Sequence, residues 1–204
     1  MATMTILETH WQSAKKTGAT FVGNYELCVV AEKHGLEMGT DSIPMNPGGT
    51  LDVKGARVTA TQAFHSLSMS PNLSLGDAPD DLYFRPDGAV CGMVMAFNNG
   101  VTVYNTADTT VFSDMQLIGQ MHGPQVAILP VGGKYTMGIR EAARAASFIR
   151  PDIVIPCHYG EALGQPADID ALSEAVSFLS PNTKVVELAP GSSVTYHTSS
   201  FEIN

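Results

Sequence analysis

Three polar residues of this 204-residue chain stand where they could bind a metal ion. His65, Asp108 and His158 each come shortly after an apolar run that is typical of a β-strand, and strand ends are where α/β folds usually place their sites. Two imidazoles and a carboxylate suit zinc, and also iron or manganese. The spacing alone equally allows ordinary strand-terminal residues, with each imidazole capping a carbonyl and Asp108 forming a local turn.

The elements that must position these residues alternate between strand and helix in the second half of the chain. Apolar periodicity predicts strands at 50–53, 56–63, 89–97, 101–104, 126–129, 153–155, 184–188 and 194–197, and helices at 113–121, 139–149 and 169–179. Such alternation predicts helices packed over a sheet. Because no linker divides the chain, we expect a single α/β domain over residues 1–204.

The first part of the chain predicts shorter elements. We expect strands at 3–7 and 20–22, a brief helix at 11–16, and a second helix that begins after an Asn24 N-cap and ends near His34-Gly35. Ser66 to Asp87 is rich in Ser, Asn, Asp and Pro and begins directly after His65. Long irregular stretches in compact domains are usually functional loops.

The composition excludes several classes of protein. A formal charge of −9 without any Lys/Arg cluster argues against a nucleic-acid partner. The N-terminus lacks the basic and apolar regions of a secretory signal, and no window approaches a membrane span. We therefore expect a cytoplasmic protein with a small-molecule substrate. Cys28, Cys91 and Cys157 are odd in number and widely separated, so we expect free thiols.

Several segments, in the right order, resemble one known family. Tyr104 to Thr109 is similar to the stretch around the bridging Asp of ascorbate-6-phosphate-lactonase-like members of the metallo-β-lactamase superfamily, and Ile155 to Gly160 to the segment with their last metal-binding His. Met45 to Gly49 and Ala63 to Ser66 resemble the lead into a third His position. The resemblance implies a metallo-β-lactamase-like αββα sandwich with a metal site at its edge.

The chain departs from that family near its start. The resemblance implies an early His-x-His-x-Asp-His turn and strands before it, but here Thr9-His10 runs directly into Trp11 to Gly18. We therefore expect an N-terminally truncated version of the fold. His65, Asp108 and His158 are carried over as ligands of one divalent ion, with zinc expected and manganese or iron as alternatives. His10 is a fourth candidate ligand or else an exposed residue near a frayed end.

Two functions follow from this resemblance and from the missing His-x-His-x-Asp-His turn. The first is a metal-dependent hydrolase of a small ester, lactone or phosphoester, with metal-bound water as nucleophile and with Tyr159 and Thr136 near the substrate. The second is a non-catalytic relic or binding module whose metal site is incomplete. Because the missing strands would leave a sheet edge unpaired, we also expect a homo-oligomer with Thr3 to Val22 in or near its interface.

Overall fold

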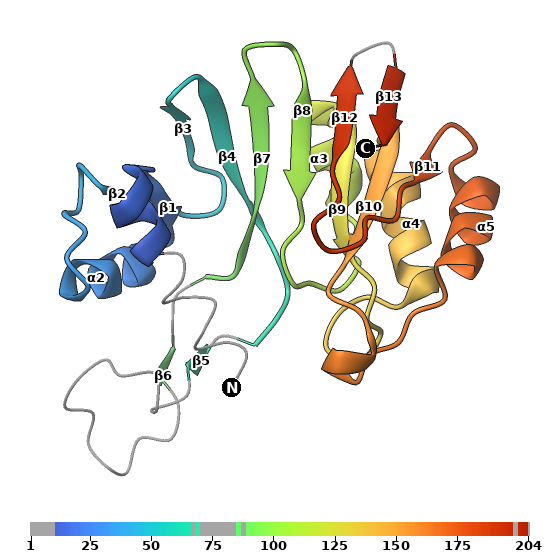
Figure 1. The fold of residues 1–204 in the computed structure, drawn as a ribbon, viewed down its shortest axis with the longest axis horizontal. Helices are drawn as coiled ribbons and strands as arrows, with labels where there is room; N and C mark the ends of the chain where they lie inside the picture. Colours follow the sequence, from blue (N-terminus) through green and yellow to red (C-terminus); the bar gives the residue numbers. More distant parts are fainter. Residues whose placement is uncertain (1–10, 67, 70–84, 87–88, 198–199, 204) are drawn as a thin grey trace. The chain divides into compact units, whose positions relative to one another are not determined.

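The computed structural model describes residues 11–66, 68–69, 85–86, 89–197 and 200–203 of the chain. These residues belong to two compact units, one containing residues 1–49 and 66–90 and the other residues 50–65 and 91–204 (Figure 1). Both combine helices and strands, as the predicted α/β class requires. The prediction of a single domain stays a prediction. None of the described helices is long and apolar enough to span a membrane.

The first unit is built around a short strand-helix-strand element. A helical segment at 11–17 precedes β1 (Phe21–Gly23), α2 (Tyr25–Lys33) and β2 (Ser42–Pro44), and the two strands pair in parallel. The predicted N-cap is confirmed, because the Asn24 side chain accepts a hydrogen bond from the Leu27 N–H at 2.8 Å. Trp11 packs with apolar side chains of α2 and stacks on His34.

Several sequence predictions fall outside the described residues. They include the strand at 3–7, His10 and most of the loop at 66–87. Within that loop the structure describes β5 (Ser68–Met69) and β6 (Arg85–Pro86), which pair antiparallel in the first unit.

The second unit contains a seven-stranded mixed sheet. In spatial order its strands are β11 (Lys184–Val185), β10 (Ile153–Cys157), β9 (Val126–Pro130), β8 (Thr102–Asn105), β7 (Cys91–Phe97), β4 (Ala56–Gln62) and β3 (Thr50–Val53). Strands β8 to β11 are mutually parallel, whereas β3, β4, β7 and β8 pair antiparallel. Since β4 and β8 both run opposite to β7, the C-terminal ends of β4, β8, β9 and β10 lie at the same edge of the sheet.

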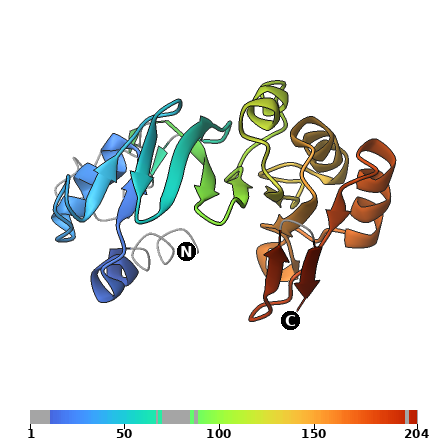
Figure 2. The same cartoon turned by 90° about the horizontal axis from the view of Figure 1, so that it is seen from above.

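Helices cover one face of the parallel strands, and a hairpin lies against the other. Figure 2 shows α3 (Met115–His122), α4 (Ile139–Ile149) and α5 (Ile169–Leu179) on one side and β12 (Val194–His197) with β13 (Ser200–Ile203) on the opposite side. Four buried alanines of α4 join the main core: Ala142, Ala143, Ala145 and Ala146. Both faces of the parallel strands are therefore buried, which holds their C-terminal ends in place.

The structure agrees closely with the predicted elements of this unit. Strand β3 and helices α4 and α5 have the predicted bounds. One predicted strand, at 184–188, is shorter, because β11 ends at Val185. The three cysteines are free thiols, as predicted.

Candidate metal centre

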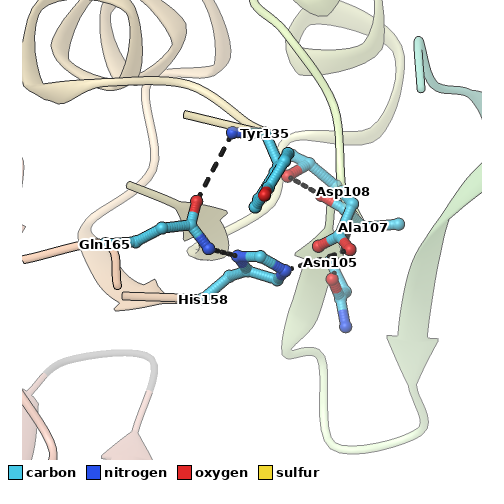
Figure 3. Close-up of polar contacts among 7 residues, drawn as sticks. Asn105, Ala107, Asp108, Tyr135, His158 and Gln165 are labelled. Atoms are coloured by element: carbon cyan, nitrogen blue, oxygen red, sulfur yellow. Dashed lines mark hydrogen bonds and ion pairs between the residues drawn. The ribbon is translucent and has the colours of Figure 1, made fainter. Parts of the chain in front are cut away.

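Asp108 and His158 meet at the C-terminal edge of the parallel strands. Asp108 follows β8 and His158 follows β10, with β9 between the two strands. The His158 Nε2 lies 3.4 Å from the Asp108 Oδ2 (Figure 3). The His158 side chain is 30% exposed and the Asp108 side chain 43% exposed, so an ion or a small molecule can reach them from solvent.

The separation of these two atoms fits two ligands of one ion. A charge-assisted hydrogen bond between an imidazole and a carboxylate would bring them to about 2.7–2.9 Å. Two ligand atoms that each lie about 2.1 Å from a tetrahedral zinc ion are about 3.4 Å apart. The observed 3.4 Å matches the second arrangement, and a nitrogen with an oxygen donor is a set that zinc accepts.

The backbone beside each of these side chains has an unusual conformation. Ala107 has φ 56° and His158 has φ 54°, in the left-handed region that non-glycine residues rarely adopt. The Ala107 N–H donates to the Asn105 Oδ1 at 3.0 Å, which holds the turn before Asp108. Left-handed backbone costs an L-residue roughly 1–2 kcal/mol, and such residues concentrate at functional sites. The strain therefore supports a functional interpretation of the pair.

Gln165 holds the other side of the His158 ring. Its side chain is buried, and its Nε2 lies 3.4 Å from the His158 Nδ1, while its Oε1 accepts from the Tyr135 main-chain N–H at 3.4 Å (Figure 3). The main chains of Gln165 and Gly160 also exchange two hydrogen bonds. Gln165 thus joins the loop after β9 to the loop after β10 and orients the imidazole.

Gly132 makes room for this arrangement. A Cβ added to Gly132 would lie 2.5 Å from the His158 main-chain oxygen and 2.6 Å from the Gln165 Oε1. Real Cβ atoms do not approach other atoms so closely, so any larger residue would displace His158 or Gln165. Position 132, two residues after the end of β9, must therefore be glycine for His158 and Gln165 to take these positions.

The structure does not assemble the predicted three-residue cluster. Within the part of the chain that the structure describes, no three His, Cys, Asp or Glu side chains are placed to hold one ion. The main chain next to His65 is nevertheless anchored close to Asp108, because the Phe64 N–H donates to the Thr109 Oγ1 at 2.9 Å and the Thr110 N–H to the Phe64 oxygen at 3.4 Å. That His65 joins Asp108 and His158 at one ion therefore stays a prediction, and the contacts of Phe64 bring the main chain next to His65 toward that edge.

The remaining predicted site residues have separate positions. His10 lies outside the described residues. The Tyr159 hydroxyl donates to the Glu187 Oε1 at 2.9 Å, and burial, together with this carboxylate, raises the pKa of Tyr159 to about 12. The Thr136 Oγ1 is buried and has no hydrogen-bond partner among the described residues. Thr136 follows Tyr135 in the loop between β9 and α4, which Gln165 contacts.

Cys157 stands beside His158 in sequence but has different chemistry. Burial, and to a lesser degree the Asp108 carboxylate, raises the pKa of the Cys157 thiol to about 12. The thiol therefore stays protonated at neutral pH, and the thiolate is the form that attacks substrates or binds metals. Cys157 is thus a structural residue of β10.

Sequence reasoning missed three residues that build this centre: Asn105, Gly132 and Gln165. Asn105 lies in a segment that resembles a known family, and Gly132 comes shortly after the predicted strand at 126–129, but neither position alone indicates a role. Gln165 carries no local signal, since it acts through contacts with residues seven and thirty positions away. A strand order for β8 to β10 would have been needed to find it.

Comparison with known proteins finds clear relatives. Residues 4–159 match the family described as the Beta-lactamase superfamily domain. A UPF0173 metal-dependent hydrolase of Staphylothermus marinus is 38% identical over 183 residues, which cover 90% of this chain and 70% of that protein. The UPF0173 metal-dependent hydrolase MK1542 of Methanopyrus kandleri is 37% identical over 179 residues, or 88% of this chain and 72% of that protein.

A solved structure has a similar fold. Igni18, described as a novel metallo hydrolase from the hyperthermophilic archaeon Ignicoccus hospitalis, superposes with a TM-score of 0.70 at 30% sequence identity. The superposition covers 88% of this chain and 70% of that one. The sequence and structural similarities therefore point to the same group of proteins.

Proposed function

This chain belongs to the Beta-lactamase superfamily and, within it, to the UPF0173 metal-dependent hydrolases, and from that premise we propose that it is a metal-dependent hydrolase of a small ester, lactone or phosphoester. The observation that carries the proposal is the Asp108–His158 pair, whose 3.4 Å separation suits two ligands of one ion. Zinc is the proposed ion, and manganese or iron would accept the same donors.

His65 is the proposed third ligand. Catalytic zinc sites commonly use three protein ligands and keep one position open. His65 directly follows Phe64, whose main chain is hydrogen-bonded to the two residues after Asp108. An imidazole nitrogen of His65 would complete this set of three ligands beside the pair.

The residues around the pair suit the handling of a small polar substrate. A bound divalent ion would act as a Lewis acid and lower the pKa of water to about 7. Asp108 and His158 would hold the ion, and the partly exposed edge would admit the substrate. Thr136, whose hydroxyl has no partner among the described residues, is the proposed donor to a substrate oxygen, and Tyr159, whose hydroxyl donates to Glu187, is proposed to line the substrate.

Metal content and hydrolysis test this proposal together. The chain, purified without added metal and then incubated with zinc, should retain about one equivalent by elemental analysis and should hydrolyse some members of an ester, lactone and phosphodiester panel. His158→Ala should lose both properties. His197→Ala is the matched control, because His197 is an exposed residue of β12. Two retained equivalents, or hydrolysis unaffected by chelators and by His158→Ala, would contradict the mechanism.

A binding module without catalysis is the second candidate. It is favoured by the finding that no three potential ligands converge within the described residues. In that case the Asp108–His158 pair would bind an ion or a ligand weakly, and no substrate of the panel would be turned over. Zinc binding without zinc-dependent hydrolysis would select this alternative.

A further inference from the structure

The Gln165 side chain lies between two groups whose hydrogen-bonding roles constrain each other. Gln165 is only 3% exposed. Its amide meets the Tyr135 main-chain N–H on one side and the His158 Nδ1 on the other, each at 3.4 Å (Figure 3). Gln165 is thus enclosed, and the close approach of Gly132 leaves its Oε1 little space.

The direction of each hydrogen bond follows from Tyr135. A main-chain N–H can only donate, so the Gln165 oxygen must face it, and the amide nitrogen then faces His158. Because an amide nitrogen also only donates, the His158 Nδ1 must accept. A neutral imidazole with an accepting Nδ1 carries its proton on Nε2, which points at the Asp108 Oδ2.

We propose that Gln165 is a positioning residue that selects the Nε2–H tautomer of His158 in the metal-free chain and thereby weakens ion binding at Nε2. An ion needs the Nε2 lone pair, so the proton must move from Nε2 to Nδ1, with no proton gained or lost overall. The Gln165 amide must then turn over so that its oxygen accepts from Nδ1–H. After this rotation the Gln165 amide nitrogen faces the Tyr135 N–H. Both groups are donors, so neither can accept a hydrogen bond from the other.

A carboxylate at position 165 would remove this conflict. Both carboxylate oxygens accept, so a Glu could accept from the Tyr135 N–H and from Nδ1–H at the same time. Metal-binding histidines commonly donate to such a carboxylate, and losing the partner typically costs about 10–100-fold in metal affinity. Gln165 is therefore the feature of this centre that keeps the ion loosely held. The effect of Gln165 on ion affinity is the second half of the inference, after the tautomer of His158, and this half rests on the proposed function.

The test compares the wild-type chain with Gln165→Glu and Gln165→Met. At pH 8, ¹⁵N NMR of metal-free wild type should show His158 with an unprotonated Nδ1, whereas Gln165→Glu should show a protonated Nδ1. Zinc titration should then rank the affinities Glu above Met above Gln, with at least about a tenfold gain for Gln165→Glu. Met removes the opposed donor without supplying an acceptor, so it should fall between the two.

The ranking separates this inference from a merely structural role. If Gln165 only supported the loop, both substitutions would weaken zinc binding, and wild type would bind tightest, which would overturn the proposal. A protonated Nδ1 in the metal-free wild type would also overturn it. Thermal unfolding checks that both variants fold. If wild type and both variants bind no zinc, the proposed function and the affinity half both fail, and the NMR result alone decides the tautomer half.

Discussion

The seven-stranded sheet has a parallel half, β8 to β11, and an antiparallel half, β3, β4 and β7, and polar residues leave both at the same edge. Adjacent strands lie about 4.8 Å apart, so β8 and β10 are separated by about 10 Å, as are β4 and β8. A glycine lies within β7, the strand between β4 and β8, and another lies two residues after β9, the strand between β8 and β10. Gly132 follows β9, and Gly92 lies in β7 with the Thr61 Oγ1 and the Asn105 oxygen within 2.9 Å of its missing Cβ.

The two halves of the sheet differ in which groups come together between alternate strands. Across Gly132, side chains meet, and Asp108 comes within 3.4 Å of His158. At the end of β4, main chain meets side chain, because the Phe64 N–H is held by the Thr109 hydroxyl. This hydrogen bond anchors the backbone directly before His65. In the parallel half the contact with Gln165 also positions a side chain, the His158 ring.

Removing either member of the pair should have the largest effect. His158→Ala or Asp108→Ala should reduce zinc affinity more than about 100-fold, because loss of an outer partner alone costs about 10–100-fold and these residues would bind the ion directly. Calorimetric zinc titration measures the change, with His197→Ala as the control. A loss of less than about tenfold for both variants would show that the ion binds elsewhere.

Gly132→Ala should lower both the stability of the protein and its zinc affinity. The new Cβ would lie 2.5 Å from the His158 main-chain oxygen, so the strand end or the loop must shift. Overpacking of this kind costs about 1–3 kcal/mol of stability, and zinc affinity should fall with it. Gly138→Ala is the control, because its nearest neighbour is the end of the flexible Glu141 side chain at 3.1 Å. Equal denaturant midpoints for both variants would contradict the close-packing argument.

His65→Ala should weaken zinc binding by about tenfold, less than loss of either paired residue, because no group of three potential ligands is formed among the described residues, whereas Asp108 and His158 already lie 3.4 Å apart. The same titration measures the effect. A loss as large as that of His158→Ala would mean that the antiparallel half is as well organised for metal binding as the parallel half. Unchanged zinc affinity in His65→Ala would show that His65 is not a ligand and that the protein binds the ion through Asp108 and His158.

The contact of the β12 hairpin with the parallel half predicts a change at high pH. Tyr196 on β12 donates to Asp152, and burial, followed by this carboxylate, raises the pKa of Tyr196 from 10.0 to about 12. As pH rises from about 10 to about 12, the unfolded chain loses this proton while the folded chain keeps it, so stability should fall. Tyr196→Phe should show a shallower fall in melting temperature, and an unchanged slope would contradict this assignment.

The smallest effect should come from the exposed end of the antiparallel half. Arg57 pairs with Asp52 at 3.1 Å, with side chains 66% and 75% exposed. Exposed pairs of this kind contribute about 0–1 kcal/mol, so Arg57→Ala should change stability by less than about 0.5 kcal/mol. Zinc affinity should not change, because these residues belong to the hairpin of β3 and β4. A clear loss of zinc affinity would show that the two halves are coupled.

Local sequence was sufficient for most elements of the second unit. Apolar periodicity predicted α4 and α5 with their observed bounds, because each buries one face against a sheet and exposes the other. It also placed Asp108 and His158 after strands, and a parallel arrangement sends such residues to one edge. The sequence also predicted that Asn24 caps the N-terminus of α2, since capping depends on residues three positions apart.

Only the tertiary structure decided which of these residues meet. The 3.4 Å approach of Asp108 to His158 depends on the strand order β8-β9-β10 and on the absence of a side chain at Gly132. The same spacing rules predict that His65 joins them, and the hydrogen bond from the Phe64 N–H to Thr109, which no local pattern predicted, brings the preceding main chain to this edge. Local pattern determines which face a residue takes along its own element, whereas distances between side chains far apart in sequence depend on register and packing between elements.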